Sequence, residues 1–179
     1  MRVQRFGEHR AMPWANGLGT SYEVASDRNV DDVWTWRVAI APVVLDGPFS
    51  VMPGVDRELV VIEGNGMVLN VDSESVKCEP GQVVRFFGDS VTIASLVDGP
   101  VVDLGLMTVR DSVIGSMVVI ADAGDVIETD VLVAVGEAAF EDEHGRQYRL
   151  GIKDALLDVR GHQLALLNGL AIAVHVKAL

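Results

Sequence analysis

Two short stretches of the sequence carry most of the side chains that could bind or transform a small molecule. The first, residues 12–23, sets three such side chains among turn-forming glycines: Trp14, Asn16 and Thr20. The second, residues 46–57, ends on an arginine after a loop rich in Gly, Pro and Asp. Indole rings wall pockets, whereas amide and hydroxyl groups orient polar ligands. The surrounding segments are plain alternating strands, so the contrast indicates a shaped site on a β scaffold.

A structural explanation of the first stretch is also open. Asn16-Gly17 is a common hairpin turn, and Trp14 would then plug one end of the core. Gly17 and Gly19 do not form a dinucleotide-binding fingerprint, because Tyr22 occupies the third glycine position and no helix follows. The sequence is compatible with both a ligand-binding wall and a simple turn.

Standard catalytic and metal-binding spacings are missing from the sequence. The four histidines are scattered, with no i, i+2 or i, i+4 pair among them: His9, His144, His162 and His175. Cys78 is the lone cysteine, so it can form neither an intrachain disulfide nor part of a cysteine cluster. No Ser-His-Asp or Cys-His set can be assembled from the spacing alone.

The composition is that of an acidic globular protein with a well-buried core. Of 179 residues, 49% are hydrophobic, and 14 Lys and Arg against 26 Asp and Glu give a net charge of −12. Nucleic acid and anionic membranes need a cationic footprint, so neither is expected as a partner. The N-terminus does not resemble a signal peptide, and no apolar run is long enough to span a bilayer. We expect a cytoplasmic protein, and whether it forms a homodimer is left open.

Short strand candidates, separated by Gly, Pro and Asp turns, run through the whole chain. They occupy residues 20–25, 34–41, 59–62, 67–71, 82–87, 91–96 and 101–109, and then residues 113–121, 130–135, 147–150, 155–159, 163–167 and 170–176. This pattern favours a β-sandwich or barrel over alternating strands and helices. We predict an all-β protein of two packed halves: residues 1–110, which carry the pocket, and a smaller half, residues 111–179.

Local patterns add two details to this prediction. The sequence Glu63-Gly-Asn-Gly66 between two strand candidates indicates a tight hairpin, because Gly and Asn tolerate positive φ. Successive side chains of a strand point to opposite faces, so residues 34–41 should place Arg37 with Ala39 on one face and Trp34 on the other.

Several motifs resemble those of the HutD/Ves family and occur in the family's order. They are Pro13-Trp-Ala-Asn-Gly-Leu-Gly-Thr20, Trp36-Arg37, Asp46-Gly-Pro-Phe-Ser50, Pro53-Gly-Val-Asp-Arg57, Glu63-Gly-Asn-Gly66 and Gly99-Pro-Val-Val-Asp103. The resemblance covers residues 5–110, whereas residues 111–179 match only in length and β texture. It implies a cupin-like double-stranded β-helix in two halves, a bicupin, associated with bacterial histidine utilisation or stress responses through small-molecule binding. The chain departs from the family where Lys, Gly and Asn are usual: at Ala15, Leu18 and Gly105.

Comparison with the cupin hairpin points to Arg57 as the most informative residue. Aligned on residues 61–64, Arg57 falls near the position of the metal-ligating glutamate, and the loop before it contains no histidine. A metal would need several imidazoles and a carboxylate, so we expect neither a metal nor another cofactor. A guanidinium instead suits a carboxylate or phosphate, with Arg37 as a second cation. Alternatively, Arg57 forms a structural ion pair with a nearby carboxylate: Asp56, Glu58, Glu63 or Asp103.

The sequence favours non-enzymatic binding of a small anionic metabolite, with no catalytic residue, through five ligand-binding residues: Trp14, Asn16, Thr20, Arg37 and Arg57. Two other classes of function stay open. A metal-independent isomerase or hydrolase acting on a small carboxylate or sugar would use Glu23 or Glu63 as acid or base. It would show a carboxylate with a raised pKa facing Arg57. A protein-interaction module would show an apolar surface patch and a filled barrel interior.

Overall fold

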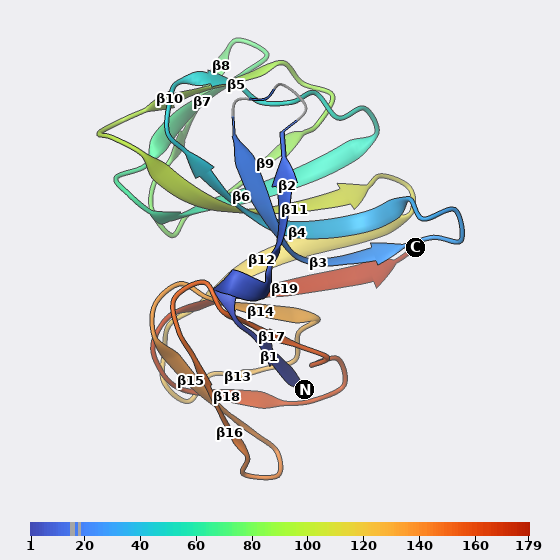
Figure 1. The fold of residues 1–179 in the computed structure, drawn as a ribbon, viewed down its shortest axis with the longest axis vertical. Coiled ribbons are helices and arrows are strands. Elements are labelled where there is room, and N and C mark those ends of the chain that lie inside the picture. The colour runs from blue at the N-terminus through green and yellow to red at the C-terminus, as the bar shows by residue number, and fades with distance from the viewer. Residues whose placement is uncertain (15–16, 18) are drawn as a thin grey trace. The chain divides into compact units, whose positions relative to one another are not determined.

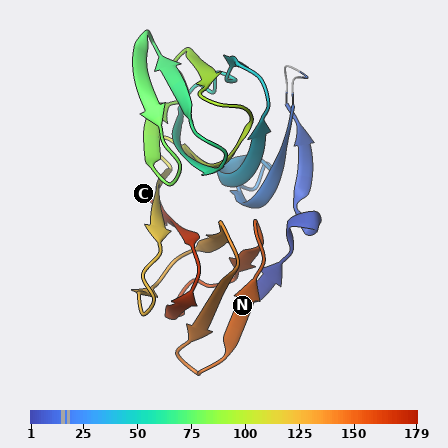
Figure 2. The same ribbon diagram turned by 90° about the vertical axis from the view of Figure 1, so that its left-hand side faces the viewer.

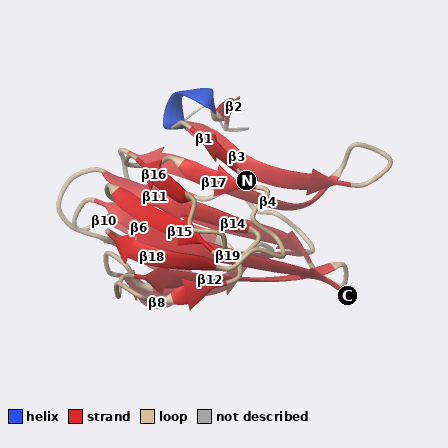
Figure 3. Cartoon of the chain, turned by 90° about the horizontal axis from the view of Figure 1, so that it is seen from below, coloured by secondary structure: helices blue, strands red, loops and turns tan. Residues whose placement is uncertain are grey.

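The computed structural model of the chain describes residues 1–14, 17 and 19–179. Nearly all of its elements are β-strands, and the one helical segment among the described residues is the 3-10 helix η1 (Phe6–Glu8), blue in Figure 3. No helix in this part of the chain is long and apolar enough to cross a bilayer. The predicted all-β fold class is confirmed.

The chain forms two compact units. One comprises Arg10–Gly115 and Lys177–Leu179, and the other comprises Met1–His9 and Ser116–Val176. The first nine residues therefore fold with the C-terminal strands, whereas the sequence division counted them with residues 1–110. Each unit consists of two antiparallel sheets (Figure 1).

The unit Arg10–Gly115 holds a six-stranded and a four-stranded sheet. Figure 2 shows its strands curving around a shared interior. The six-stranded sheet has the order β2 (Arg10–Pro13), β3 (Thr20–Arg28), β4 (Trp34–Val43), β11 (Val101–Val109), β6 (Val55–Glu63), β9 (Val83–Phe87). The four-stranded sheet has the order β5 (Gly47–Pro48), β10 (Thr92–Leu96), β7 (Met67–Val71), β8 (Glu74–Cys78).

Period-two alternation builds the core of this unit from both sheets. In β7, Met67 and Leu69 are buried, while Asn70 faces solvent. They join Leu59 and Val61 of β6 in one hydrophobic cluster. Burying such side chains stabilises the fold by about 1.5–3 kcal/mol each, so the inward face of each strand is set by its apolar residues.

The second unit repeats this plan with its own core. Its five-stranded sheet has the order β1 (Arg2–Gln4), β17 (Ala155–Leu157), β14 (Val131–Ala134), β19 (Ala171–Ala178), β12 (Val113–Ile120). Its four-stranded sheet has the order β13 (Val126–Ile127), β18 (Leu164–Asn168), β15 (Ala138–Asp142), β16 (Gln147–Leu150). Phe140, Leu132 and Leu164 are fully buried in its core.

The central strand β11 is the part of the fold that positions polar side chains most directly. It pairs with β4 on one side and β6 on the other, so that Met107 stands opposite both Arg37 and Arg57. Residues opposite each other on antiparallel strands share a face. The pairing therefore brings two arginines, distant in sequence, to one face of the sheet.

A register shift in the pairing of β11 with β6 occurs immediately before Asp103. It leaves Asp103 opposite Val61 and moves Glu63 opposite Val102. A change of register by one residue exchanges the faces that side chains occupy. From Asp103 onward the pairing is regular, so Asp103 shares the face of Met107 and the two arginines, whereas Glu63 is displaced from the alternation that would have placed it there.

The glycine-rich turn between β6 and β7 is not the predicted hairpin, because β6 pairs with β11 and β9 in one sheet and β7 pairs with β10 and β8 in the other. It connects the two sheets, and its backbone geometry can be tested. Gly64 has φ +91°, and a Cβ there would lie 2.6 Å from the carbonyl oxygen of Pro100. We expect Gly64→Ala to lower the free energy of unfolding by about 2–4 kcal/mol, because left-handed strain and overpacking add. The control Gly99→Ala, at φ +75° with nothing within 4 Å, should lose only about 1–2 kcal/mol. If urea unfolding showed equal losses of stability for the two variants, the steric clash at Gly64 would be contradicted.

Candidate functional site

One face of the six-stranded sheet borders a cavity of about 400 Å³ within the unit Arg10–Gly115. Its floor comes from alternate residues of three neighbouring strands: Arg37, Ala39, Ala41 and Val43 of β4, Asp103, Gly105 and Met107 of β11, and Arg57 of β6. Its walls come from Met12 to Trp14, Ser21 and the loop Pro48 to Met52. The two stretches singled out in the sequence thus line the same cavity.

Arg57 is held in this cavity by aromatic rings and a backbone carbonyl. Its guanidinium carbon lies 5.1 Å from the ring centroid of Phe49 and 4.9 Å from that of Phe86. Its Nη1 donates a hydrogen bond to the carbonyl oxygen of Ser50 at 3.4 Å. Such cation–π contacts stabilise a guanidinium without neutralising it, so Arg57 keeps its charge available to the cavity.

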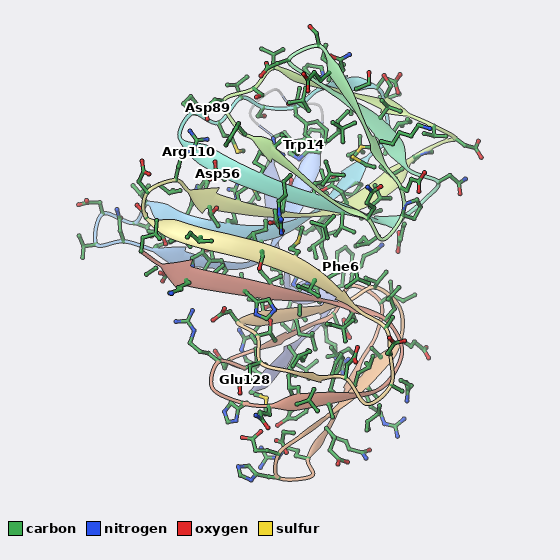
Figure 4. The ribbon with its side chains drawn as sticks, turned by 180° about the vertical axis from the view of Figure 1, so that it is seen from behind. Phe6, Trp14, Asp56, Asp89, Arg110 and Glu128 are labelled. Atoms are coloured by element: carbon green, nitrogen blue, oxygen red, sulfur yellow. The ribbon has the colours of Figure 1, made fainter. Side chains whose placement is uncertain are left out.

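The carboxylates next to Arg57 in sequence have other partners. Asp56 accepts a hydrogen bond from Arg110 at 2.8 Å, and Figure 4 shows these two side chains together. Glu58 forms an ion pair with Arg85. In the part of the chain that the structure describes, no carboxylate lies within ion-pair distance of the Arg57 guanidinium. Arg57 is therefore not the structural ion-pair residue of the alternative prediction.

Arg37 lies among sulfur and aromatic atoms. It donates to the Sδ atoms of Met12 at 3.8 Å and Met107 at 3.4 Å, both weak acceptors. Its guanidinium carbon lies 5.0 Å from the ring centroid of Trp34. The Nε atom is buried and has no hydrogen-bond partner among the described residues. Arg37 therefore has donor capacity that the surrounding protein leaves unused.

The contact between Arg37 and Trp34 corrects one prediction. Alternation placed Trp34 on the opposite face, but its ring lies over the guanidinium on the cavity side. Trp34 is the first residue of β4 and pairs with β3 beyond a register shift. Simple alternation fails there because the pairing is irregular.

The electrostatics of the cavity favour an incoming negative charge. Burial lowers the pKa of Arg57, and the nearby Arg37 charge lowers it further while Asp103 raises it. Burial is also the main cause that lowers the pKa of Arg37. Arginine nevertheless stays protonated in proteins, so each lowered pKa reports a guanidinium that is short of compensating negative charge.

Asp103 is a cavity residue that the sequence did not select as a ligand-binding candidate. It is 5% exposed, and burial raises the pKa of its carboxyl group from 3.8 to about 7 although the Arg57 charge acts to lower it. No donor among the described residues lies within hydrogen-bonding distance of this carboxyl group. The available signal was a single acidic residue in the otherwise apolar run of residues 101–107.

The two glutamates considered as acid or base lie outside the cavity lining. Glu23 accepts a hydrogen bond from Ser26 at 3.3 Å and forms ion pairs with Arg28 at 3.7 Å and Arg10 at 3.9 Å. Glu63 is displaced by the register shift in β6. The raised carboxyl pKa that an enzyme would require thus occurs on a different residue from those predicted. Among the described residues, no group of three His, Cys, Asp or Glu side chains is arranged to hold a metal ion.

The remaining predicted ligand-binding residues have different positions. Trp14 lines the cavity and donates its Nε1–H to the hydroxyl of Ser21 at 2.7 Å. Thr20 is not among the lining residues, whereas Ser21, its neighbour on β3, is. Asn16 lies outside the described residues. The structure thus brings Trp14, Arg37 and Arg57 together.

The arrangement of strands is that of the cupin class. The Cupin 2 conserved barrel domain protein from Leptotrichia buccalis superposes with a TM-score of 0.59 at 9% identity, covering 88% of each chain. At this identity the likeness concerns the fold alone. It confirms the predicted cupin-like fold.

The chain belongs to the HutD family, whose model matches residues 7–173. The structure of HutD from Pseudomonas fluorescens SBW25 superposes with a TM-score of 0.84 at 25% identity, covering 99% of this chain and 98% of the other. This membership confirms the family resemblance seen in the sequence motifs.

Two curated relatives match over part of their length. Protein Ves from Citrobacter koseri is 36% identical over 107 residues, covering 57% of this chain and 56% of that protein. An uncharacterised 21.2 kDa protein in the hutC 3' region of Pseudomonas putida is 32% identical over 109 residues, covering 60% and 57%. The chain thus spans a little over half the length of these relatives.

The buried Asp103 should make the stability of the protein depend on pH. Between pH 3.8 and about 7 the unfolded chain releases a proton that the folded state keeps. The free energy of unfolding should therefore fall as pH rises through this range, by at most about 4 kcal/mol at about 1.4 kcal/mol per pH unit. Below this range both states are protonated and the carboxyl group contributes no difference.

Urea unfolding of Asp103→Asn at about pH 5 and pH 8 tests this linkage. At pH 8 Asp103→Asn should be more stable than the parent. Its free energy of unfolding should fall much less than the parent's between pH 5 and pH 8. Asp98→Asn, at an exposed position, should retain the parent's profile. A fall of the same size in Asp103→Asn as in the parent would show that other groups cause it.

Proposed function

We propose that this protein binds a small anionic metabolite in the cavity of the unit Arg10–Gly115, without catalysing a reaction. The observation that carries the proposal is that Arg37 and Arg57 line one cavity, and no carboxylate among the described residues lies within ion-pair distance of either. The net charge of −12 repels anions at long range. Binding an anion therefore requires such a local pair of cations.

The cavity supplies shape as well as charge for this ligand. Arg57 and Arg37 can each present parallel N–H groups, which suit the two oxygens of a carboxylate. Trp14, Phe49 and Met107 add apolar surface beside them. A cavity of about 400 Å³ is in the range of small-molecule sites and differs from the filled interior expected of a protein-interaction module. Asn16 and Thr20 remain predicted contributors.

The family supports a metabolic context for this binding. One relative is described by its place in a hutC 3' region, and the family carries the name HutD. We propose that the ligand is an acidic intermediate of histidine breakdown and that binding is regulatory in the cytoplasm, in histidine utilisation or a stress response. Family membership supports the context, and the two arginines support the charge of the ligand.

Calorimetric titration with small carboxylates, including formylglutamate and urocanate, tests the proposal. One compound should bind the parent protein, and Arg57→Ala or Arg37→Ala should weaken its binding by about 2–3 kcal/mol, the worth of hydrogen bonds to a charged group. Arg149→Ala is the control, because it removes the same charge from an exposed position in the other unit. The proposal fails if the panel does not bind, or if all three variants bind like the parent.

A second candidate function is favoured by the position of Asp103. A buried carboxyl group with a pKa of about 7 in a cavity beside Arg57 is the arrangement expected of a general acid or base in a metal-independent isomerase. Asp103 would accept a proton from a substrate carbon, and an arginine would stabilise the resulting enolate oxygen.

Solvent exchange separates binding from this catalysis. A ligand identified by titration would be incubated with the protein in D₂O and followed by NMR. Non-enzymatic binding predicts that carbon-bound hydrogens keep their signals at full intensity. Deuterium incorporation that requires Asp103 and is lost in Asp103→Asn would establish the enzyme instead.

A further inference from the structure

A ligand bound as in the proposed function, on which this inference rests, lies beside a third ionisable group, the carboxyl group of Asp103. Asp103 extends from β11 on the same face as Arg37 and Arg57. Its partners across the strands are Ala41 and Val61, which are apolar and offer no side-chain donor. The carboxyl group therefore lies on an apolar part of the cavity floor, next to but not paired with the two cations.

Gly105 leaves this carboxyl group uncovered on its other side. It is the next residue of β11 on the cavity face, and a Cβ built there would lie 3.8 Å from Oδ1 of Asp103. Glycine carries no side chain that could donate a hydrogen bond or fill this space. Oδ1 is thus open toward the interior of the cavity.

The charged and titratable groups around Asp103 come from the two strands that flank β11 and from β8 of the four-stranded sheet. Arg57 on β6 and Arg37 on β4 are cations, and among the described residues neither lies within ion-pair distance of the carboxyl group. Cys78 on β8 has its thiol pKa raised to about 11, first by burial and then by the Asp103 charge, so it stays neutral. None of these groups supplies the donor that a buried carboxylate needs.

We propose that Asp103 selects ligands that carry an N–H or O–H donor beside the anionic group received by Arg37 and Arg57. A ligand with such a donor satisfies the ionised Asp103 directly. An anion without a donor brings the same negative charge but leaves the ionised Asp103 without a hydrogen bond, so it binds only when that carboxyl group holds a proton. The two ligand types therefore differ in how their affinity depends on pH.

Pairs of acids that differ by one hydroxyl group provide the probes: propionate and lactate, succinate and malate, glutarate and 2-hydroxyglutarate. Calorimetric titration of the parent protein would be run at about pH 6.5 and 8.5. The affinity for the members without a hydroxyl should fall by more than about tenfold, because binding requires a proton on Asp103. The affinity for the hydroxylated members should change by less than about threefold.

Two variants test whether Asp103 causes the different pH dependence of the acids with and without a hydroxyl group. In Asp103→Asn the acids without a hydroxyl should bind with the same affinity at both pH values, because no proton need be taken up. Gly105→Asn would place an amide donor beside Oδ1, within the space that glycine leaves. It should bring the two members of each pair to equal affinity, since the protein itself then satisfies Asp103.

The outcomes separate this inference from the proposed function. Identical pH profiles for both members of a pair, or a profile that persists in Asp103→Asn, would overturn the role of Asp103 while leaving anion binding intact. A parent protein that binds none of these acids, nor any other carboxylate, at either pH would overturn the proposed function and the inference together. Circular dichroism of both variants would verify that they are folded.

Discussion

The pairing of β11 with β4 and β6 is the constraint on which the candidate site depends. Hydrogen bonding along both edges of this strand holds Arg37, Met107 and Arg57 in one row across the sheet. A slip of one residue would turn this row to the opposite face. The site is therefore as stable as the register of the central strand, which the buried apolar side chains of the core maintain.

The same face carries charges whose burial is only partly compensated. Aromatic rings and sulfur atoms surround the two guanidiniums, and burial raises the pKa of the nearby Asp103 carboxyl group to about 7. Removing ions from water costs several kcal/mol when no partner replaces the solvent. In this fold the incompletely compensated charges gather at one cavity, as is typical of ligand-binding sites.

Much of this arrangement follows from sequence patterns, and the parts that do not follow depend on strand pairing. Alternation correctly placed Arg37 beside Ala39. The glycine-rich sequence after β6 marked a turn, but the predicted hairpin was wrong because the strands on either side of it belong to different sheets. The position of Trp34 was wrong, and the displacement of Glu63 was not foreseen, because register shifts interrupt alternation without leaving a clear signal in one strand. Asp103 was missed as a ligand-binding residue because its place beside the arginines depends on cross-strand neighbours.

The contacts of Arg57 bear on the entropy of binding. Free arginine side chains sample many rotamers, and immobilising such a side chain on association costs about 0.5–1.5 kcal/mol. Contacts with Phe49, Phe86 and the Ser50 carbonyl confine this guanidinium within the protein. The entropic cost of immobilising Arg57 is therefore already part of folding, and the anion binds a guanidinium that is held in place. Such preorganisation raises affinity without adding a single contact.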